Sequence, residues 1–236
     1  MKKLVKIAAG ALGAAAGAYA GYVAIAYARY GRGQGGPDNP LLDACMPDYE
    51  VREVHEVAVN APAPVTMAAA REVAFADSQV VRALFRLREW PGRLRGMRVA
   101  PIQRRPVLEE VLEIGWRPLA EEPGRRLVMG AVTQPWKQNV VFRGLGSGEF
   151  AAFREPDYAK IAWTLEADAS GASASVFRTE TRVATTDEGA RRRFRWYWSL
   201  LSPGILLIRR EILRLVKTEA ERRAPVPPAS SPQPFV

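Results

Sequence analysis

Few side chains of this 236-residue chain could do acid–base or nucleophilic chemistry. His55 is the only histidine and Cys45 the only cysteine, which excludes a Cys/His zinc site and an intramolecular disulfide. A serine triad would have to use His55 as its base. His55 shares the apolar parity of Val57 and Val59, and a single inward-facing histidine is usually a hydrogen-bonded core residue. We therefore assign no catalytic residue, no metal and no cofactor.

Two other polar features have structural explanations. Gly144 to Gly148 reads GLGSG, but no lysine accompanies it and no helix is expected after it, so a hairpin turn is favoured over a phosphate cradle. Asp187 and Glu188 are better explained by capping of a helix and by its dipole than by acid–base chemistry. Neither feature predicts an active site.

The composition favours a folded domain with anionic partners. The chain is 48% apolar, which suffices for a core, and its 34 basic and 25 acidic residues give a net charge of +9. Nucleic acid and lipid headgroups are both anionic enough to attract such a chain. No nucleic-acid-binding motif is visible, so nucleic acid is not an expected partner.

Residues 1–30 form the segment most unlike the rest. The uncharged run Ile7–Ala28 is long enough to span a bilayer as a helix, although it is mostly alanine and glycine. We predict a membrane anchor; the alternative is a cleaved export signal, since Ala18–Ala20 has the small-x-small form of a cleavage site. Three lysines precede the run and two arginines follow it. This favours a single pass through a bacterial inner membrane, with the domain on the periplasmic or extracellular side.

Three glycines of this segment fall at four-residue spacing, namely Gly13, Gly17 and Gly21. Small residues at that spacing let two membrane helices approach closely. They are the predicted contact of a homodimer. After this segment, residues 31–40 read as a Gly/Pro linker, 41–223 as one folded domain and 224–236 as a disordered proline-rich tail.

Alternating and helical patterns define the domain. Strands are expected over 49–59, 111–119, 126–132, 138–143, 149–153, 160–167 and 173–185, and short helices over 65–73 and 77–90. A capping box of Thr185 and Glu188 then begins a long helix with an apolar stripe from Phe194 to Leu215. Pro203-Gly204 should kink that helix or divide it into two.

This order, with its particular residues, resembles the SRPBCC superfamily, the START-related helix-grip or polyketide cyclase/dehydrase-like proteins. The residues that carry the resemblance are Val54–Val57, Ala61-Pro62, Glu121–Gly124, Phe153–Lys160, Thr179–Val183, Phe194–Trp198 and Ile208–Arg210. The resemblance implies an α+β helix-grip fold, in which a curved antiparallel sheet wraps around the C-terminal helix. It also implies a cavity between sheet and helix that usually takes an apolar ligand. Fold alone does not decide function in such a superfamily.

Aromatic rings are the predicted ligand-binding residues. They lie on the expected strands, in their connections and on the long helix: Trp116, Trp136, Phe150, Phe153, Trp163, Phe177, Tyr197 and Trp198. The alternative for each ring is that it fills the core. Glu180 and Arg182 share the opposite strand parity from Phe177. They are either a solvated surface pair or polar handles inside the cavity, and the cost of burying two charges favours the surface.

The arginine-rich segment between Pro91 and Pro106 carries the predicted membrane-surface residues, which are Arg93, Arg95, Arg98, Arg104 and Arg105. The favoured function is a membrane-tethered protein that binds an apolar or amphipathic small molecule, such as a lipid or isoprenoid. One alternative is a cyclase- or aromatase-like enzyme, which needs an acid or base in the cavity. The other is an envelope interaction module whose cavity is filled by its own side chains.

Overall fold

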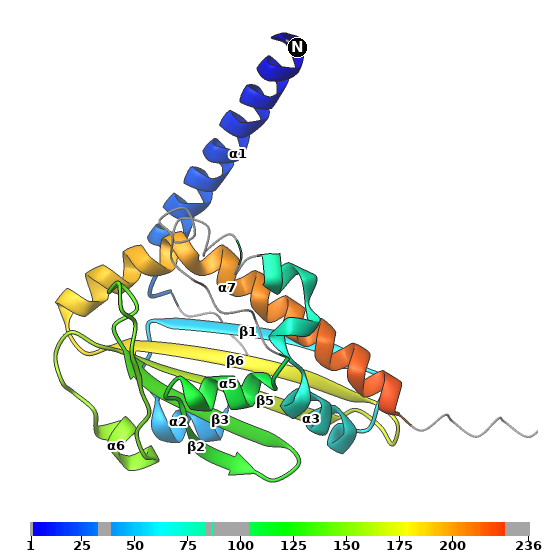
Figure 1. Cartoon of the computed structure of the whole chain (residues 1–236). Coiled ribbons are helices and arrows are strands. Elements are labelled where there is room, and N and C mark those ends of the chain that lie inside the picture. The colour runs from blue at the N-terminus through cyan, green and yellow to red at the C-terminus, as the bar shows by residue number, and fades with distance from the viewer. Residues whose placement is uncertain (1, 33–38, 84–85, 87–103, 225–236) are drawn as a thin grey trace, which may run out of the picture.

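The computed structural model describes residues 2–32, 39–83, 86 and 104–224, without the side chains of residues 2–9, 11 and 12 (Figure 1). Its helices are α1 (Lys2–Arg29), α2 (Pro40–Cys45), α3 (Ala63–Glu72), the 3-10 helix η1 (Phe75–Asp77), α5 (Val107–Glu113), α6 (Ser147–Ala152) and α7 (Glu188–Arg223). Its strands are β1 (Val51–Val59), β2 (Arg117–Glu122), β3 (Arg126–Thr133), β4 (Phe142–Arg143), β5 (Ala159–Ala169) and β6 (Ser175–Thr185).

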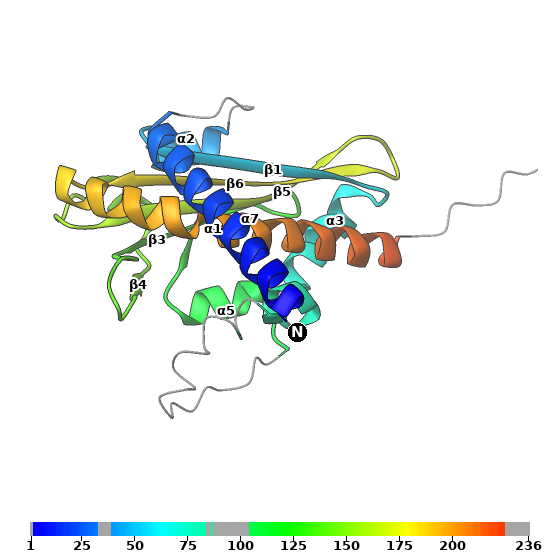
Figure 2. The same cartoon turned by 90° about the horizontal axis from the view of Figure 1, so that it is seen from above.

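The six strands form one antiparallel sheet in the order β1-β6-β5-β3-β2, with β4 paired to β3. Figure 2 shows α7 running along the length of β1, β6 and β5. Phe177 and Val59 of the sheet pack with Leu213 and Val216 of α7 in one buried cluster. An antiparallel sheet with a long C-terminal helix on one face is the α+β arrangement that the sequence predicted.

The opposite face of the sheet is also covered. Leu42 and Cys45 of α2 and Phe150 of α6 pack there against Val128 and Ala162. Alternate residues of each strand therefore face two different cores, as the two-residue period of a strand requires. The chain has three layers: α7 with α3 and α5, the sheet, and α2 with α6.

The prediction that Glu180 and Arg182 are solvated is wrong. Their side chains are 1% and 2% exposed and lie on the face away from α7, under α2. Arg182 donates from Nη1 to Asp43 Oδ1 at 2.6 Å and from Nε to Glu180 Oε1 at 2.7 Å. Arg52 donates to both oxygens of the same carboxylate. Sequence patterning could not show that α2 would cover this face and supply Asp43 as a counter-charge.

Most of the predicted strands are confirmed, and two are wrong. Of the strand expected over 111–119, residues 111–113 belong to α5 instead, and β2 begins only at Arg117. Residues 147–152 form α6. At the start of this helix, the backbone N–H of Gly146 donates a hydrogen bond to Glu149 Oε2 at 3.1 Å. The Gly144–Gly148 segment thus enters a short helix and is not a hairpin turn. Both wrong segments are short apolar runs, for which periodicity separates helix from strand poorly.

The long helix begins two residues later than its expected cap. Asp187, not Thr185, accepts the backbone N–H of Ala190 at 2.8 Å. The helix continues through Pro203 to Arg223, so it is not divided into two. Figure 1 shows that α7 changes direction near its middle, close to the base of α1. This bend is the kink that Pro203 predicted.

The N-terminal segment is helical, as α1. In the part of the chain that the structure describes, no helix combines the length and the apolarity needed to cross a membrane. Nothing lies within 4 Å of the place where a Cβ would stand on Gly13, Gly17 or Gly21, and the homodimer through them stays a prediction. Residues 33–38 of the linker and 225–236 of the tail lie outside the described residues.

Candidate functional site

A cavity of about 210 Å³ lies between the sheet and α7. Its walls are mainly apolar, from α3, η1, α5, β5 and the second half of α7: Ala70, Val73, Phe75, Val107, Leu108, Val111, Trp163, Leu165, Ile205, Ile208 and Ile212. Its polar lining consists of Thr179, Thr181 and Arg209. Apolar walls with a few polar groups are the usual composition of a small-molecule site.

One row of side chains on the sheet face toward α7 runs from this cavity to the strand at its side. Glu53 of β1 stands opposite Thr181 of β6, which stands opposite Trp163 of β5. Two residues further along β1, His55 stands opposite Thr179. Side chains directly opposite on antiparallel strands lie about 4.5–5.5 Å apart at Cβ. The fold thus brings a carboxylate, an imidazole and two hydroxyls to one patch of the sheet that faces α7.

Arg209 is the charged residue that α7 presents to this patch. It stands four residues after Ile205 and three before Ile212, and therefore lies on the apolar stripe of the helix. Burial lowers the pKa of Arg209 to about 10, and Glu53 partly opposes that shift. The guanidinium is still charged at neutral pH. Burial likewise raises the pKa of the Glu53 carboxyl, and Arg209 partly offsets this rise.

Three buried polar atoms, two on this patch and one on α7 facing it, have no hydrogen-bond partner. They are Nδ1 of His55, Oγ1 of Thr181 and Nη1 of Arg209. Among the described residues only two other side-chain atoms share this state, in Arg126 and Trp136. Buried polar groups are normally satisfied, and leaving one unsatisfied costs about 1–3 kcal/mol. Thr181 and Arg209 line the apolar cavity, and His55 stands opposite Thr179, which lines it too; this marks the cavity as the candidate ligand site.

His55 gives a direct test of this environment. Burial, followed by the nearby guanidinium groups of Arg209 and Arg210, lowers the pKa of His55. The unfolded chain then binds a proton at a higher pH than the folded chain does. The free energy of unfolding should therefore fall as the pH drops below about 6.5. NMR titration of the single histidine ring should give a midpoint below that value, and His55→Gln should reduce the acid sensitivity of unfolding. A midpoint at or above 6.5 would contradict this placement.

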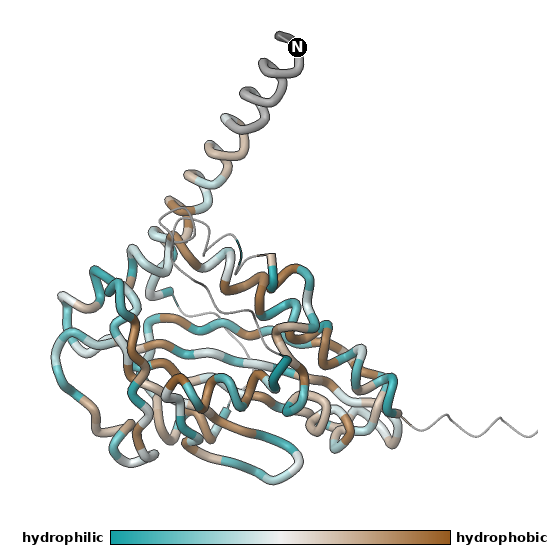
Figure 3. The backbone as a smooth tube through the Cα atoms, in the orientation of Figure 1, coloured by the Kyte–Doolittle hydropathy of each residue, from teal (hydrophilic) through white to brown (hydrophobic). Residues whose placement is uncertain are grey.

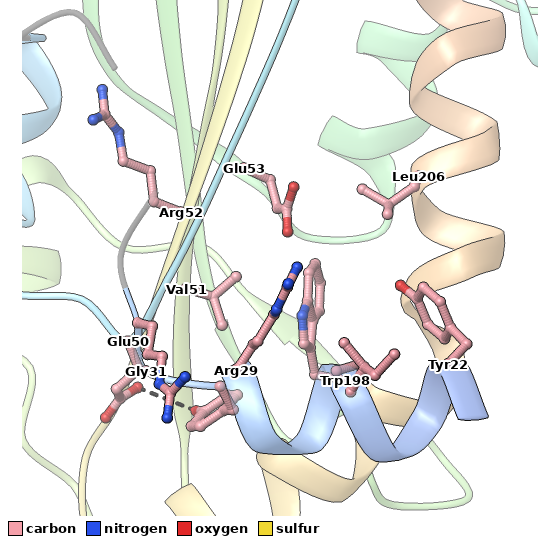
Figure 4. Close-up of a pocket in the computed structure, with 13 residues that line it drawn as sticks. Tyr22, Arg29, Gly31, Glu50, Val51, Arg52, Glu53, Trp198 and Leu206 are labelled. Carbon is pink, nitrogen blue, oxygen red and sulfur yellow. Dashed lines mark hydrogen bonds between the residues drawn. The ribbon is translucent and has the colours of Figure 1, made fainter. Parts of the chain in front are cut away.

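A second hollow, a groove of about 390 Å³, lies beside the cavity between α1, the start of β1 and α7. Figure 4 shows Tyr22 and Arg29 from α1, Glu53 from β1 and Trp198 from α7 around it. Glu53 lines the groove, whereas Thr181, its partner across the strands, lines the cavity. The groove and the cavity therefore adjoin at the Glu53–Thr181 pair.

The predicted aromatic residues do not form one set. Trp163 lines the cavity and Trp198 the groove. Trp116 and Phe177 are buried in the α7-side core, and Trp136 and Tyr197 pack beside the Phe194 cluster. Phe150 and Phe153 lie on the opposite face of the sheet, with α2.

Of the predicted membrane-surface arginines, Arg93, Arg95 and Arg98 lie outside the described residues. Arg104 and Arg105 are paired with the carboxylates of Asp77 and Glu113, each with a 2.7–2.8 Å hydrogen bond. Two serines of α7 are also engaged: Ser199 donates to the carbonyl of Arg195, and Ser202 shares a hydrogen bond with Tyr22. These serines have structural roles.

Sequence reasoning missed Glu53 and Arg209. Glu53 occupies the same parity as Val51, His55 and Val57, so a charge in an otherwise inward-facing row was the available signal. Arg209 is one of several arginines on the long helix, so its charge alone does not distinguish it. Its helical spacing from Ile205 and Ile212 was the signal that it lies on the stripe.

The architecture now described is a helix-grip fold: an antiparallel sheet, a long C-terminal helix across it and a cavity between them. This is the arrangement that the sequence resemblance implied.

No family model and no curated protein matches the chain. Among solved structures, the Zhui aromatase/cyclase from Streptomyces sp. R1128 is 12% identical, with a TM-score of 0.28 over 73% of this chain and 94% of that one. Norcoclaurine synthase from Thalictrum flavum is 13% identical, with a TM-score of 0.28 over 81% and 97%. The di-domain ARO/CYC BexL is 14% identical, also at 0.28, and the match covers 72% of this chain and 46% of BexL. Likenesses of this size carry no argument about function.

Proposed function

We propose that the chain binds an amphipathic small molecule whose apolar body occupies the cavity and whose oxygen acceptor meets Arg209 and Thr181. The observation that supports this most is the pair of unpartnered polar atoms, Thr181 Oγ1 and Arg209 Nη1, at an otherwise apolar cavity. An apolar cavity of about 150 Å³ holds benzene. A cavity of about 210 Å³ therefore suits a somewhat larger ring system or a short aliphatic chain.

The mechanism is sequestration. Apolar surface that leaves water contributes roughly 25 cal/mol per Å², and the cavity walls supply this through Trp163, Leu165 and the isoleucines of α7. A carboxylate on the ligand would accept charge-assisted hydrogen bonds from Arg209, which are about twice as strong as neutral ones. The polar end therefore sets the orientation, and the apolar end supplies most of the binding free energy.

The proposal is tested with 1-naphthoate, an aromatic carboxylate of suitable size, and naphthalene-1-methanol as its uncharged analogue. Calorimetric titration should show binding of both probes, with the carboxylate at least about tenfold tighter, because only it pairs with a cation. A native mass spectrum of the purified full-length chain should also show a retained small molecule. A chain that binds neither probe and carries nothing would favour the interaction module with a filled cavity.

Trp163→Ala should weaken 1-naphthoate binding more than it weakens folding. Trp163 lines the cavity and is only partly buried, so its truncation should cost less stability than the 3–5 kcal/mol of a fully buried aromatic. Phe177→Ala is the matched control: Phe177 is fully buried and does not line the cavity. Phe177→Ala should lower the free energy of unfolding more than Trp163→Ala does, and the folded variant should keep its affinity for 1-naphthoate. Equal losses of binding and stability in Trp163→Ala would assign this ring to the core alone.

A second candidate function is acid–base catalysis on the same fold, as in a cyclase. It is favoured by one observation: burial raises the pKa of the Glu53 carboxyl, which lines the groove and stands opposite Thr181 of the cavity. A carboxyl group shifted toward neutral pH is suited to proton transfer. NMR in D₂O should then show Glu53-dependent deuterium exchange at the methyl group of 1-acetonaphthone, and Glu53→Gln should abolish that exchange while binding persists. Absence of exchange in the unmodified chain would leave binding alone as the function.

The proposed setting is the outer side of a bacterial inner membrane, with α1 as the tether. The support is the uncharged run Ile7–Ala28 between flanking basic residues. A denatured mass spectrum of the chain from a bacterial host should include residues 1–20, and the chain should stay in the membrane fraction after an alkaline wash. Loss of residues 1–20 would replace the tether by a cleaved signal.

A further inference from the structure

We infer that the base of α1 and the bend of α7 together form a surface that contacts an anionic lipid bilayer. This inference rests on the proposed membrane setting, but it concerns the folded domain itself. The surface, called here the bend surface, consists of Tyr19 and Ile25 of α1 and Trp196, Leu200, Leu201 and Leu207 of α7.

The bend surface is apolar and exposed. Its six side chains are 40–56% exposed, and they make up six of the eight large exposed hydrophobic residues in the described part of the chain. The other two, Ile114 and Val141, lie on neither α1 nor α7. Figure 3 shows apolar backbone colour gathered where α1 meets α7. A concentrated apolar patch of this kind marks an interaction site.

Specific contacts hold the two helices of this surface together. The hydroxyl of Tyr22 hydrogen-bonds Ser202 at 3.0 Å, and that of Tyr19 donates to the carbonyl of Leu200. Arg195 donates to the Tyr27 carbonyl at 2.8 Å, and its guanidinium stands 3.6 Å from the centre of the Tyr27 ring. The base of α1 is therefore part of the domain, while the rest of α1 projects away from it (Figures 1 and 2).

The chemistry of the surroundings favours a bilayer as the partner. Tyrosine and tryptophan side chains are enriched where a protein crosses from lipid into water, and four tyrosines of residues 19–30 and Trp196 surround this junction. Arg29, Arg32 and Arg192 lie next to it, and none of them has a carboxylate within ion-pair distance in the described residues. Unpaired basic residues near an anionic membrane are attracted to its headgroups.

The bend surface also adjoins the groove. Leu206 lines the groove and Leu207 belongs to the bend surface, and Arg29 and Trp198 line the groove from the same junction. An amphipathic molecule in the bilayer would therefore meet the groove where the domain contacts the lipid. This explains why a binding domain would keep its apolar residues exposed at this place.

The test uses the full-length chain in lipid vesicles with spin labels at single cysteines. In a Cys45→Ala background, Leu201→Cys and Leu207→Cys carry the label, and Val141→Cys and Ile114→Cys are apolar, exposed controls. Electron paramagnetic resonance compares collisions with oxygen, which enters lipid, and with a water-soluble nickel chelate. Labels at 201 and 207 should show an oxygen-to-nickel ratio several-fold above that of both controls. The ratio should rise further when phosphatidylglycerol replaces part of the phosphatidylcholine, and Arg32→Gln with Arg192→Gln should remove that rise.

Two outcomes overturn the inference and are distinguishable. If the chain floats with the vesicles while labels at 201 and 207 are as accessible to nickel as those at 114 and 141, α1 tethers a domain that makes no contact. The membrane setting then stands without the bend surface. If the chain does not float with either kind of vesicle, the membrane setting itself fails.

Discussion

Replacing Glu180 with alanine is expected to lower the free energy of unfolding by about 3–5 kcal/mol. Arg52 and Arg182 both donate to this carboxylate, and all three side chains are at most 7% exposed. Without it, two buried guanidinium groups lose the acceptor that they share. Removal of one member of a buried ionic cluster costs more than the cluster itself contributes, because the remaining charges are left uncompensated. Urea denaturation followed by tryptophan fluorescence measures the change.

Glu121→Ala is the matched control. Glu121 pairs with Arg71 on the surface, where both side chains are at least one-third exposed. Its loss should cost about 1 kcal/mol or less. A Glu180→Ala variant that is no less stable than Glu121→Ala would show that water enters the buried network and replaces the carboxylate.

Replacing Arg209 with methionine should stabilise the ligand-free chain and abolish tight binding of 1-naphthoate. The change removes a partly buried cation whose buried Nη1 has no partner, a penalty of about 1–3 kcal/mol, and leaves a side chain of similar reach among Ile205, Ile208 and Ile212. The same change removes the cation that the carboxylate meets. Truncation of one member of a buried charge pair costs at least about 2 kcal/mol of binding, roughly thirtyfold in affinity.

Arg210→Met provides the comparison, because Arg210 follows directly on the helix but is exposed. It should change neither stability nor affinity appreciably. We expect Arg209→Met to be more stable to unfolding and to bind 1-naphthoate weakly, while Arg210→Met keeps both properties. This result would show that Arg209 lowers stability in order to bind the ligand. An Arg209→Met chain that unfolds more easily would mean that Arg209 is a structural group, paired through water, and would remove it from the proposed site.

The strands at 51–59, 126–133, 159–169 and 175–185 could be predicted because each has a long alternating pattern that only a half-buried strand explains. α7 could be predicted from its stripe. α5 and α6 could not, because seven and six residues are too few to establish a period. The site was harder. The aromatic rings gave the expected cavity one lining residue, Trp163, whereas its polar groups come from a strand and a helix that sequence alone does not place face to face.

Pro203 gives α7 a mechanical property. It has no N–H to donate to the carbonyl of Ser199, so the ladder of backbone hydrogen bonds has a gap there. The gap separates the half of α7 that is fastened to α1 from the half that begins at Ile205 and forms the roof of the cavity. Because this hydrogen bond is already missing, the angle between the two halves can change there without breaking it. A change of the angle between the halves would move the cavity roof relative to the sheet while the Tyr22–Ser202 contact holds the first half on α1.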